Sequence, residues 1–305
     1  MALGGEPLRP VDLLLLGYLG IVSVVAVLRA PSQPNCWWLL VAHALFVLLL
    51  FLFTRPGLGP VGRALREIYP LLLLVGLYAE LDVLNGPATR PAYDEVVQRW
   101  ELAIFGTQAA VAWWQSAPSR FWSAVLHAAY FSYYFIILAP ALYFAVRRDL
   151  GAVRHFVLVV MTVFVLCYLV FLAFPVAGPY YVFDRPPAWF TDNLPAQVVY
   201  STLASGSSYG AAFPSSHVAA TVAAALAAYR GSRPLGLALA IPTVLLTVGV
   251  VYCQMHYGVD ALAGLAVGAA VAWGLRTVRS WEGPPPEPLA EAVEVGRPGV
   301  AQEAG

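Results

Sequence analysis

The sequence has few charged residues and no lysine. Charged side chains make up 11% of the 305 residues and hydrophobic residues make up 60%, whereas about 25% charged residues is usual for a soluble domain. This composition excludes a soluble enzyme and a disordered chain. Several apolar runs are long enough to cross a bilayer core of about 30 Å. The composition therefore predicts a polytopic membrane protein.

The sequence also has few cysteines and no net charge. Cys36, Cys167 and Cys253 are scattered without a CxxC spacing, which excludes a disulfide scaffold and indicates no redox compartment. Seventeen basic and 17 acidic residues give a formal net charge of zero, so nothing indicates a nucleic-acid partner. All 17 basic residues are arginine, which we attribute to the G+C-rich coding bias of a bacterium.

Hydropathy predicts eight membrane-spanning helices. No run alternates in the manner of a barrel strand, and backbone in lipid must satisfy its own hydrogen bonds, so each span is expected to be helical. The predicted fold class is therefore all-α, a polytopic membrane helix bundle. The spans cover residues 11–28, 37–53, 69–84, 121–146, 156–174, 217–229, 234–253 and 257–275.

The spans divide the chain into three predicted regions. Residues 1–68 hold two extra N-terminal transmembrane helices, residues 69–279 a six-helix catalytic core, and residues 280–305 a polar, disordered tail. Outside the spans, residues 85–120 form an outer segment with an interfacial helix near 96–105. Residues 175–216 form a long outer loop, which in a compact protein is more often functional than idle.

The arginines predict the direction of the spans. With the N-terminus inside, twelve arginines fall on the inner side and five on the outer side, as the positive-inside rule requires. Both termini are therefore expected to be cytoplasmic, and the protein is expected in a plasma membrane. The two long segments between spans then lie on the extracytoplasmic face.

Two short histidine motifs lie on that outer side. Residues 214–217 (PSSH) join the long loop to the sixth span, and residues 256–260 (HYGVD) open the eighth. The chain between them crosses the membrane and returns, so His217 and His256 can be neighbours. His256 and Asp260 are four apart, which on a helix places them on one face. The carboxylate can then hold one ring nitrogen and leave the other free as a nucleophile.

The serines beside His217 predict an anion site. Ser215 and Ser216 precede His217 at the start of a helix, where free N–H groups and hydroxyls favour negative charge. A phosphate held there would face His217 on one side and His256 on the other. The sixth span is short, so the site is expected to be recessed toward the acyl region, which suits a lipid substrate.

PSSH followed by HxxxD, each opening an outer-facing helix, resembles the type-2 phosphatidic acid phosphatase superfamily, whose motifs are KxxxxxxRP, PSGH and SRxxxxxHxxxD. The resemblance implies that His256 is a nucleophile that forms a phosphohistidine and that Asp260 orients it. It implies that His217 is the acid that protonates the leaving oxygen. Spans three to eight would form the family's six-helix core, and the reaction would need no metal or other cofactor.

The sequence departs from these motifs at the cationic positions. Gly178 stands at the lysine of the first motif, although Arg185 and the following proline fit its RP pair, and Ser216 replaces the glycine of the second motif. Gly249 and Val250 stand at the SR pair of the third motif.

This pattern resembles the inositol phosphorylceramide synthase-like branch, which keeps the His, His, Asp set and varies the cationic residues. Segments that read like that branch are FP at 174–175, GPY at 178–180, FPS at 213–215, MHY at 255–257, and LH at 126–127 with Tyr130, Tyr133 and Tyr134.

Five further residues are candidates for substrate binding. Arg185 is a candidate phosphate clamp, since its guanidinium can bind bidentately, or it is a solvated loop arginine; Tyr180 lies in the same loop. His127, Tyr130 and Tyr134 are predicted to fall on one helical stripe near the outer end of the fourth span. They either line a headgroup pocket or belong to an interfacial aromatic belt.

Other interpretations of the ionisable residues stay open. Two histidines and a carboxylate can bind a transition metal, although the flanking serines suit an anion better. A lipid transporter or flippase would use buried ionisable residues as a proton relay, but here they cluster at one membrane face. His43, in the second span, is expected to be a satisfied core histidine. Glu80 and Asp82 indicate a polar cavity or side chains that reach water.

Together these patterns predict a membrane lipid phosphatase or phosphotransferase. Its substrate would be a phospholipid or polyprenyl phosphate bound at the extracytoplasmic face. Water as the second nucleophile would give a phosphatase, and a polyol such as inositol would give a transferase. The residues do not decide between the two, because both reactions use the same triad.

Overall fold

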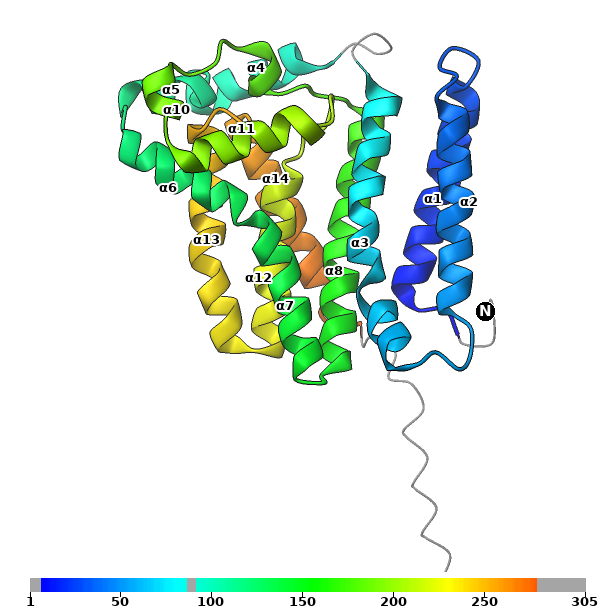
Figure 1. Ribbon diagram of the computed structural model, residues 1–305. Coiled ribbons are helices and arrows are strands. Elements are labelled where there is room, and N and C mark those ends of the chain that lie inside the picture. Colours follow the sequence, from blue (N-terminus) through cyan, green and yellow to red (C-terminus); the bar gives the residue numbers. More distant parts are fainter. Residues whose placement is uncertain (1–6, 87–91, 279–305) are drawn as a thin grey trace, which may run out of the picture.

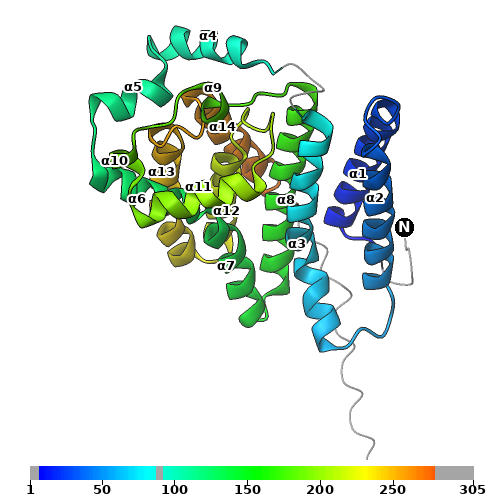
Figure 2. The same ribbon diagram turned by 45° about the horizontal axis from the view of Figure 1, so that its top comes forward.

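The computed structural model describes residues 7–86 and 92–278, and its regular secondary structure is helical, which confirms the predicted all-α fold. Long helices form a bundle, and the short helices gather at one end of it (Figures 1 and 2). The predicted tail, 280–305, lies outside the described residues. The helices are α1 (Pro10–Arg29), α2 (Cys36–Phe53), α3 (Pro60–Asn85), α4 (Asp94–Phe105), α5 (Ala109–Ser116), α6 (Arg120–Phe131), α7 (Tyr133–Val146), α8 (Leu150–Ala173), α9 (Pro179–Val182), α10 (Ala188–Thr191), α11 (Leu194–Gly206), α12 (Ser216–Gly231), α13 (Arg233–Tyr252) and α14 (Gly258–Gly274).

Every predicted span coincides with a helix or a helix pair. Among the described residues, α1, α2, α8 and α13 are long and apolar enough to cross a membrane, and the pair α6 and α7, bent by 42°, is a fifth candidate. The other three predicted spans fall on α3, α12 and α14. The last two have 16 and 17 residues, and α3 carries several charged side chains. The several apolar helices indicate a membrane protein, while the count of eight crossings stays a prediction.

Helix α8 forms the centre of the bundle. Its sequence is apolar on all sides, as expected for a helix that is surrounded by others. Phe156, Phe164 and Phe171 are fully buried along its length. With 24 residues it is about 36 Å long at 1.5 Å per residue. It therefore joins the two ends of the molecule across the thickness of a bilayer.

The hairpin of α1 and α2 lies beside α3 (Figure 1), and polar side-chain contacts join the two. The buried carboxylate of Glu80 accepts a hydrogen bond from the Tyr18 hydroxyl and pairs with His43, whose other ring nitrogen lies 2.7 Å from the Ser23 hydroxyl. His43 is thus a satisfied core histidine, as predicted, and its acid comes from a distant part of the sequence. Asp82, in contrast, is exposed.

Helices α12 and α14 pack closely because two glycines face α12. A Cβ atom added at Gly264 would lie 2.6 Å from the carbonyl oxygen of Ser215. One added at Gly268 would lie 2.4 Å from the carbonyl oxygen of Ala219. Real Cβ atoms do not approach oxygen so closely, so these positions require glycine. The two helices that carry the histidine motifs are therefore held at fixed spacing.

Helix α4 coincides with the predicted interfacial helix and has two unlike faces. Asp94, Val97 and Glu101 are buried against the protein, whereas Leu102 and Ile104 are about half exposed, at 50% and 59%. An amphipathic helix of this kind places its outward apolar side chains at a membrane surface. Its buried polar face contacts the segments that carry the candidate site.

Candidate active site

The two histidine motifs meet where α12 and α14 begin. The Ser215 N–H donates to the carbonyl oxygen of Asp260 at 3.0 Å, which joins the motifs through the backbone. His217 lies in the first turn of α12, and the centroid of its ring is 5.7 Å from that of His256. The structure thus brings together the three side chains that the sequence predicts to be catalytic.

His256 and Asp260 are paired, but not on one helical face. His256 lies in the turn before α14, which begins at Gly258. The Asp260 carboxylate caps the helix: its Oδ2 accepts a hydrogen bond from the Tyr257 N–H at 2.9 Å and lies 3.4 Å from Nδ1 of His256. The predicted pairing therefore arises from cap geometry. It leaves Nε2 of His256 as the nitrogen for a substrate.

Burial sets the charge of His256. Only 5% of the residue is exposed, and this desolvation lowers the pKa of His256 from 6.5 to about 4, a shift that the Ala212 backbone opposes. The imidazole is therefore neutral near pH 7, which is the form that acts as a nucleophile.

Two tyrosines enclose His217. The Tyr130 hydroxyl lies 3.2 Å from Nε2 of His217 and the two rings stack at 4.9 Å, while the Tyr133 ring lies 4.5 Å away. The predicted single stripe of His127, Tyr130 and Tyr134 is wrong, because the helix breaks at Ser132 between α6 and α7. Tyr134 is 43% exposed, and Tyr133 takes the place beside His217.

The start of α12 offers donors to an anion. The Ser215 hydroxyl accepts a hydrogen bond from the Val218 N–H at 3.4 Å. The N–H groups of Ser216 and His217 lie in the first helical turn, where they have no intrahelical acceptor. Both serines are buried. An anion here would receive backbone N–H groups directly beside His217.

The start of α14 is occupied instead. Glu101 of α4 is fully buried and accepts hydrogen bonds from the N–H groups of Gly258 and Val259, each at 3.0 Å, and from Ala109 at 3.1 Å. The carboxylate thus fills the positive end of the helix that follows His256. Of the two helix starts, α12 is the one with donors left for a substrate.

A second acidic residue of α4 holds the loop after α8. Asp94 accepts hydrogen bonds from the N–H groups of Ala177 and Gly178, each at 2.8 Å, and from the Tyr257 hydroxyl at 3.0 Å. Asp94 and Glu101 are not among the site residues that the sequence motifs predict. Their spacing of seven residues, two helical turns, was the visible signal that one face carries both acids.

Gly178 explains why the lysine of the first motif is missing. Its φ is +91°, a backbone conformation that favours glycine, and an added Cβ would lie 2.9 Å from the Ala212 side chain. The Gly178 N–H is also held by Asp94. A lysine at this position would be strained and would have no space.

Arg185 lies over an aromatic pair. Its guanidinium is 5.2 Å from the centre of the Tyr180 ring and 5.8 Å from that of Tyr200, and it donates to the Tyr180 hydroxyl at 3.2 Å. The Tyr200 ring is 5.9 Å from His127. Arg185 is exposed, so a cation is available at the rim of the aromatic cluster.

His127 forms part of the wall beside the histidine motifs. It is fully buried, and its Nδ1 lies 2.7 Å from the Ser123 carbonyl oxygen and 3.4 Å from Sγ of Cys253. Its buried Nε2 has no hydrogen-bond partner in the described part of the chain. Cys253 is three residues before His256. His127 therefore contacts the turn that carries the nucleophile candidate, without contacting His256 itself through a described hydrogen bond.

The comparisons with known proteins agree with this geometry. A family model described as the PAP2 superfamily matches residues 97–274, from α4 to α14. No match was found among the curated proteins or the solved structures. The matched region covers more than half of the chain and includes both histidine motifs and Arg185. The chain therefore belongs to the PAP2 superfamily, whose members are phosphatases that generally act on lipid phosphates.

Proposed function

We propose that this protein is a membrane lipid phosphatase or phosphotransferase that works through a phosphohistidine intermediate. The observation that carries the proposal is the juxtaposition of His217 and His256, with Asp260 on Nδ1 of His256 and free N–H groups at the start of α12. The phosphoryl group binds between the two rings. Arg185 and its aromatic pair receive the rest of the headgroup.

The reaction has two steps. Nε2 of His256 attacks phosphorus as the bond from phosphorus to the ester oxygen breaks, and His217 donates a proton to that oxygen. A bound phosphate beside His217 favours its protonated form. His217, now neutral, then takes a proton from the second nucleophile, which displaces His256 as the P–N bond breaks. Asp260 balances the positive charge on the phosphorylated ring.

The substrate and the membrane side follow from the wider pattern. A phospholipid or polyprenyl phosphate fits a site among membrane helices, and the arginine distribution supports a site on the extracytoplasmic face of an eight-span protein. The resemblance to the inositol phosphorylceramide synthase-like branch supports transfer to inositol or another polyol. The region 69–279 would act as the catalytic core and 1–68 as its extension.

Product partition tests the function. The full-length protein in mixed micelles is given phosphate-labelled phosphatidate or polyprenyl phosphate, with and without inositol, and with and without a chelator. Label released as inorganic phosphate, unchanged by inositol, is expected for a phosphatase, whereas label on inositol is expected for a transferase. Activity that the chelator abolishes would support a metal-dependent hydrolase instead. Lipid movement in vesicles that survives His256→Ala would support a transporter.

The acid side of the pH profile tests the charge of His256. Its lowered pKa keeps the ring neutral above about pH 4, so kcat/KM is expected to fall on the acid side near pH 4 and not near 6.5. The measurement is kcat/KM between pH 3.5 and 8, corrected for the substrate phosphate, which itself ionises near pH 6. An acid limb of kcat/KM that reports an enzyme ionisation near 6.5 would contradict a buried, neutral nucleophile, whereas loss of activity on the alkaline side would report the acid His217.

A further inference from the structure

A cavity lies at the opposite end of the bundle from His217 and His256. Its volume is about 680 Å³, and it is lined by the start of α1, the turn after α2, the first turns of α3 and the junction of α7 with α8. Leu150, at the start of α8, lines this cavity, whereas the loop after α8 contacts the candidate active site. The two sites are thus separated by the length of α8, about 36 Å.

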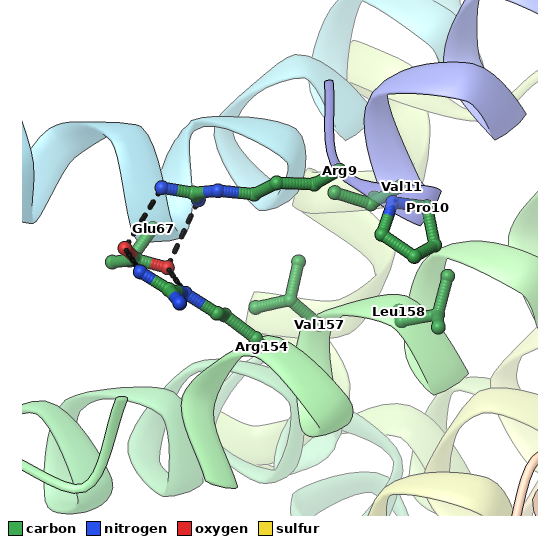
Figure 3. A pocket seen from close by; sticks show the side chains of 7 residues that line it. All are labelled: Arg9, Pro10, Val11, Glu67, Arg154, Val157 and Leu158. Carbon is green, nitrogen blue, oxygen red and sulfur yellow. Dashed lines mark hydrogen bonds and ion pairs between the residues drawn. The ribbon is translucent and has the colours of Figure 1, made fainter. Parts of the chain in front are cut away.

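The cavity is strongly cationic. Among the described residues that line it, a single acid, Glu67, faces six arginines. Glu67 lies between two of them and accepts hydrogen bonds from both Arg9 and Arg154 (Figure 3). The negative charge of Glu67 is therefore already paired with these two guanidiniums. The six are Arg9, Arg55, Arg63, Arg66, Arg148 and Arg154.

Three of these guanidiniums have no carboxylate partner among the described residues that line the cavity. Arg55 lies over the Phe51 ring at 5.0 Å, and Arg63 donates to the Leu58 carbonyl oxygen at 2.7 Å. Arg148 also lines the cavity, and Arg55, Arg63 and Arg148 are all exposed. Like charges converge here, and a bound anion would relieve their repulsion.

The end of α7 places Arg148 in the cavity lining. The φ of Arg148 is +57°, in the left-handed region that non-glycine residues rarely adopt. Arg148 belongs to the turn that joins α7 to α8. This conformation closes the end of α7, where the Arg148 N–H donates to the Ala145 carbonyl oxygen and the Asp149 N–H donates to the Phe144 carbonyl oxygen.

We propose that this cavity binds the phosphate-bearing headgroup of an anionic lipid in the leaflet opposite the candidate active site. Guanidinium groups bind phosphate oxygens bidentately, and the volume suits a small ligand. The exposed side chain of Leu150, which lines the cavity, would contact the acyl chains. A positive-inside bias alone scatters arginines over a face, whereas these converge on one cavity.

Lipid binding to the full-length protein tests the proposal. The triple variant Arg55→Gln/Arg63→Gln/Arg148→Gln is compared with Arg147→Gln/Arg276→Gln, whose residues do not line the cavity. Both are made in a His256→Ala background so that bound lipid is not turned over. Native mass spectrometry in detergent measures binding of phosphatidylglycerol and phosphatidylcholine. We expect the triple variant to bind phosphatidylglycerol at least tenfold more weakly, with the control variant unchanged.

The other outcomes are decisive as well. Equal binding by the triple and control variants would overturn the cavity as a lipid site, as would equal affinity for phosphatidylcholine. If millimolar inorganic phosphate or glycerol phosphate displaced the lipid, the cavity would be a site for a soluble phosphate. If the triple variant does not fold, the single variant Arg148→Gln against Arg147→Gln gives the same comparison with an expected loss of about threefold.

Discussion

Replacing His256 with alanine is expected to lower lipid-phosphate turnover by about 10⁴-fold or more. The nucleophile is lost, so the covalent phosphoenzyme intermediate cannot form. The protein should still fold, since the backbone contacts of this turn do not involve the imidazole. The measurement is kcat with a labelled lipid phosphate, together with elution as a single species from a sizing column.

The matched control is His155→Ala. His155 lies on α8 near the other end of the bundle, and its Nε2 is buried and has no hydrogen-bond partner among the described residues. Turnover by this variant is expected to stay within about twofold of the unaltered protein. A phosphoenzyme trapped by acid-free denaturation should be present in the unaltered protein and in His155→Ala, and absent in His256→Ala. Turnover that survives in His256→Ala would refute the phosphohistidine scheme.

Replacing Glu101 with leucine is expected to lower kcat by about 10²-fold and to destabilise the protein by several kcal/mol. The substitution leaves the N–H groups of Ala109, Gly258 and Val259 buried without their acceptor, at a cost of about 1–3 kcal/mol each. The start of α14 would then shift His256 relative to His217, and a displacement of about 1 Å is enough for a loss of this size. Thermal unfolding and steady-state kinetics measure the two effects.

Glu101 is a positioning residue, so a conservative variant should restore part of both effects. The amide oxygen of Glu101→Gln can keep the two hydrogen bonds that Oε1 accepts, while its NH₂ group faces the third donor. Its kcat and melting temperature should fall between those of the leucine variant and the unaltered protein, with KM little changed. Glu95→Leu, on the exposed side of α4, is the control. Equal kcat for Glu101→Leu and Glu95→Leu would show that α4 does not position the site.

The sequence predicted the elements and the motifs because both depend on local patterns. Apolar runs identify helices through burial, and the two histidine motifs sit at helix starts that the loop composition marks. The superfamily that those motifs indicate is confirmed by the family model that matches residues 97–274. The branch within it, the second nucleophile and the roles of His217, His256 and Asp260 stay predictions.

The sequence could not show contacts between distant segments. His43 and Glu80 are 37 residues apart, and no periodicity links them. Glu101 reaches Gly258 across 157 residues. The break at Ser132 also has no glycine or proline to mark it, so a continuous span was predicted and Tyr134 was placed with Tyr130. In each case tertiary packing determines the contact or the helix break, and local sequence propensity does not predict it.

The glycine contacts between α12 and α14 also decide where lipid tails can go. Because Gly264 and Gly268 bring the two helices into backbone contact, acyl chains have no passage between them. His217 also contacts the bend of α6 and α7, through the rings of Tyr130 and Tyr133. Tails would enter there. Evolution of a new lipid preference would then alter α6 and α7 and leave the glycines in place.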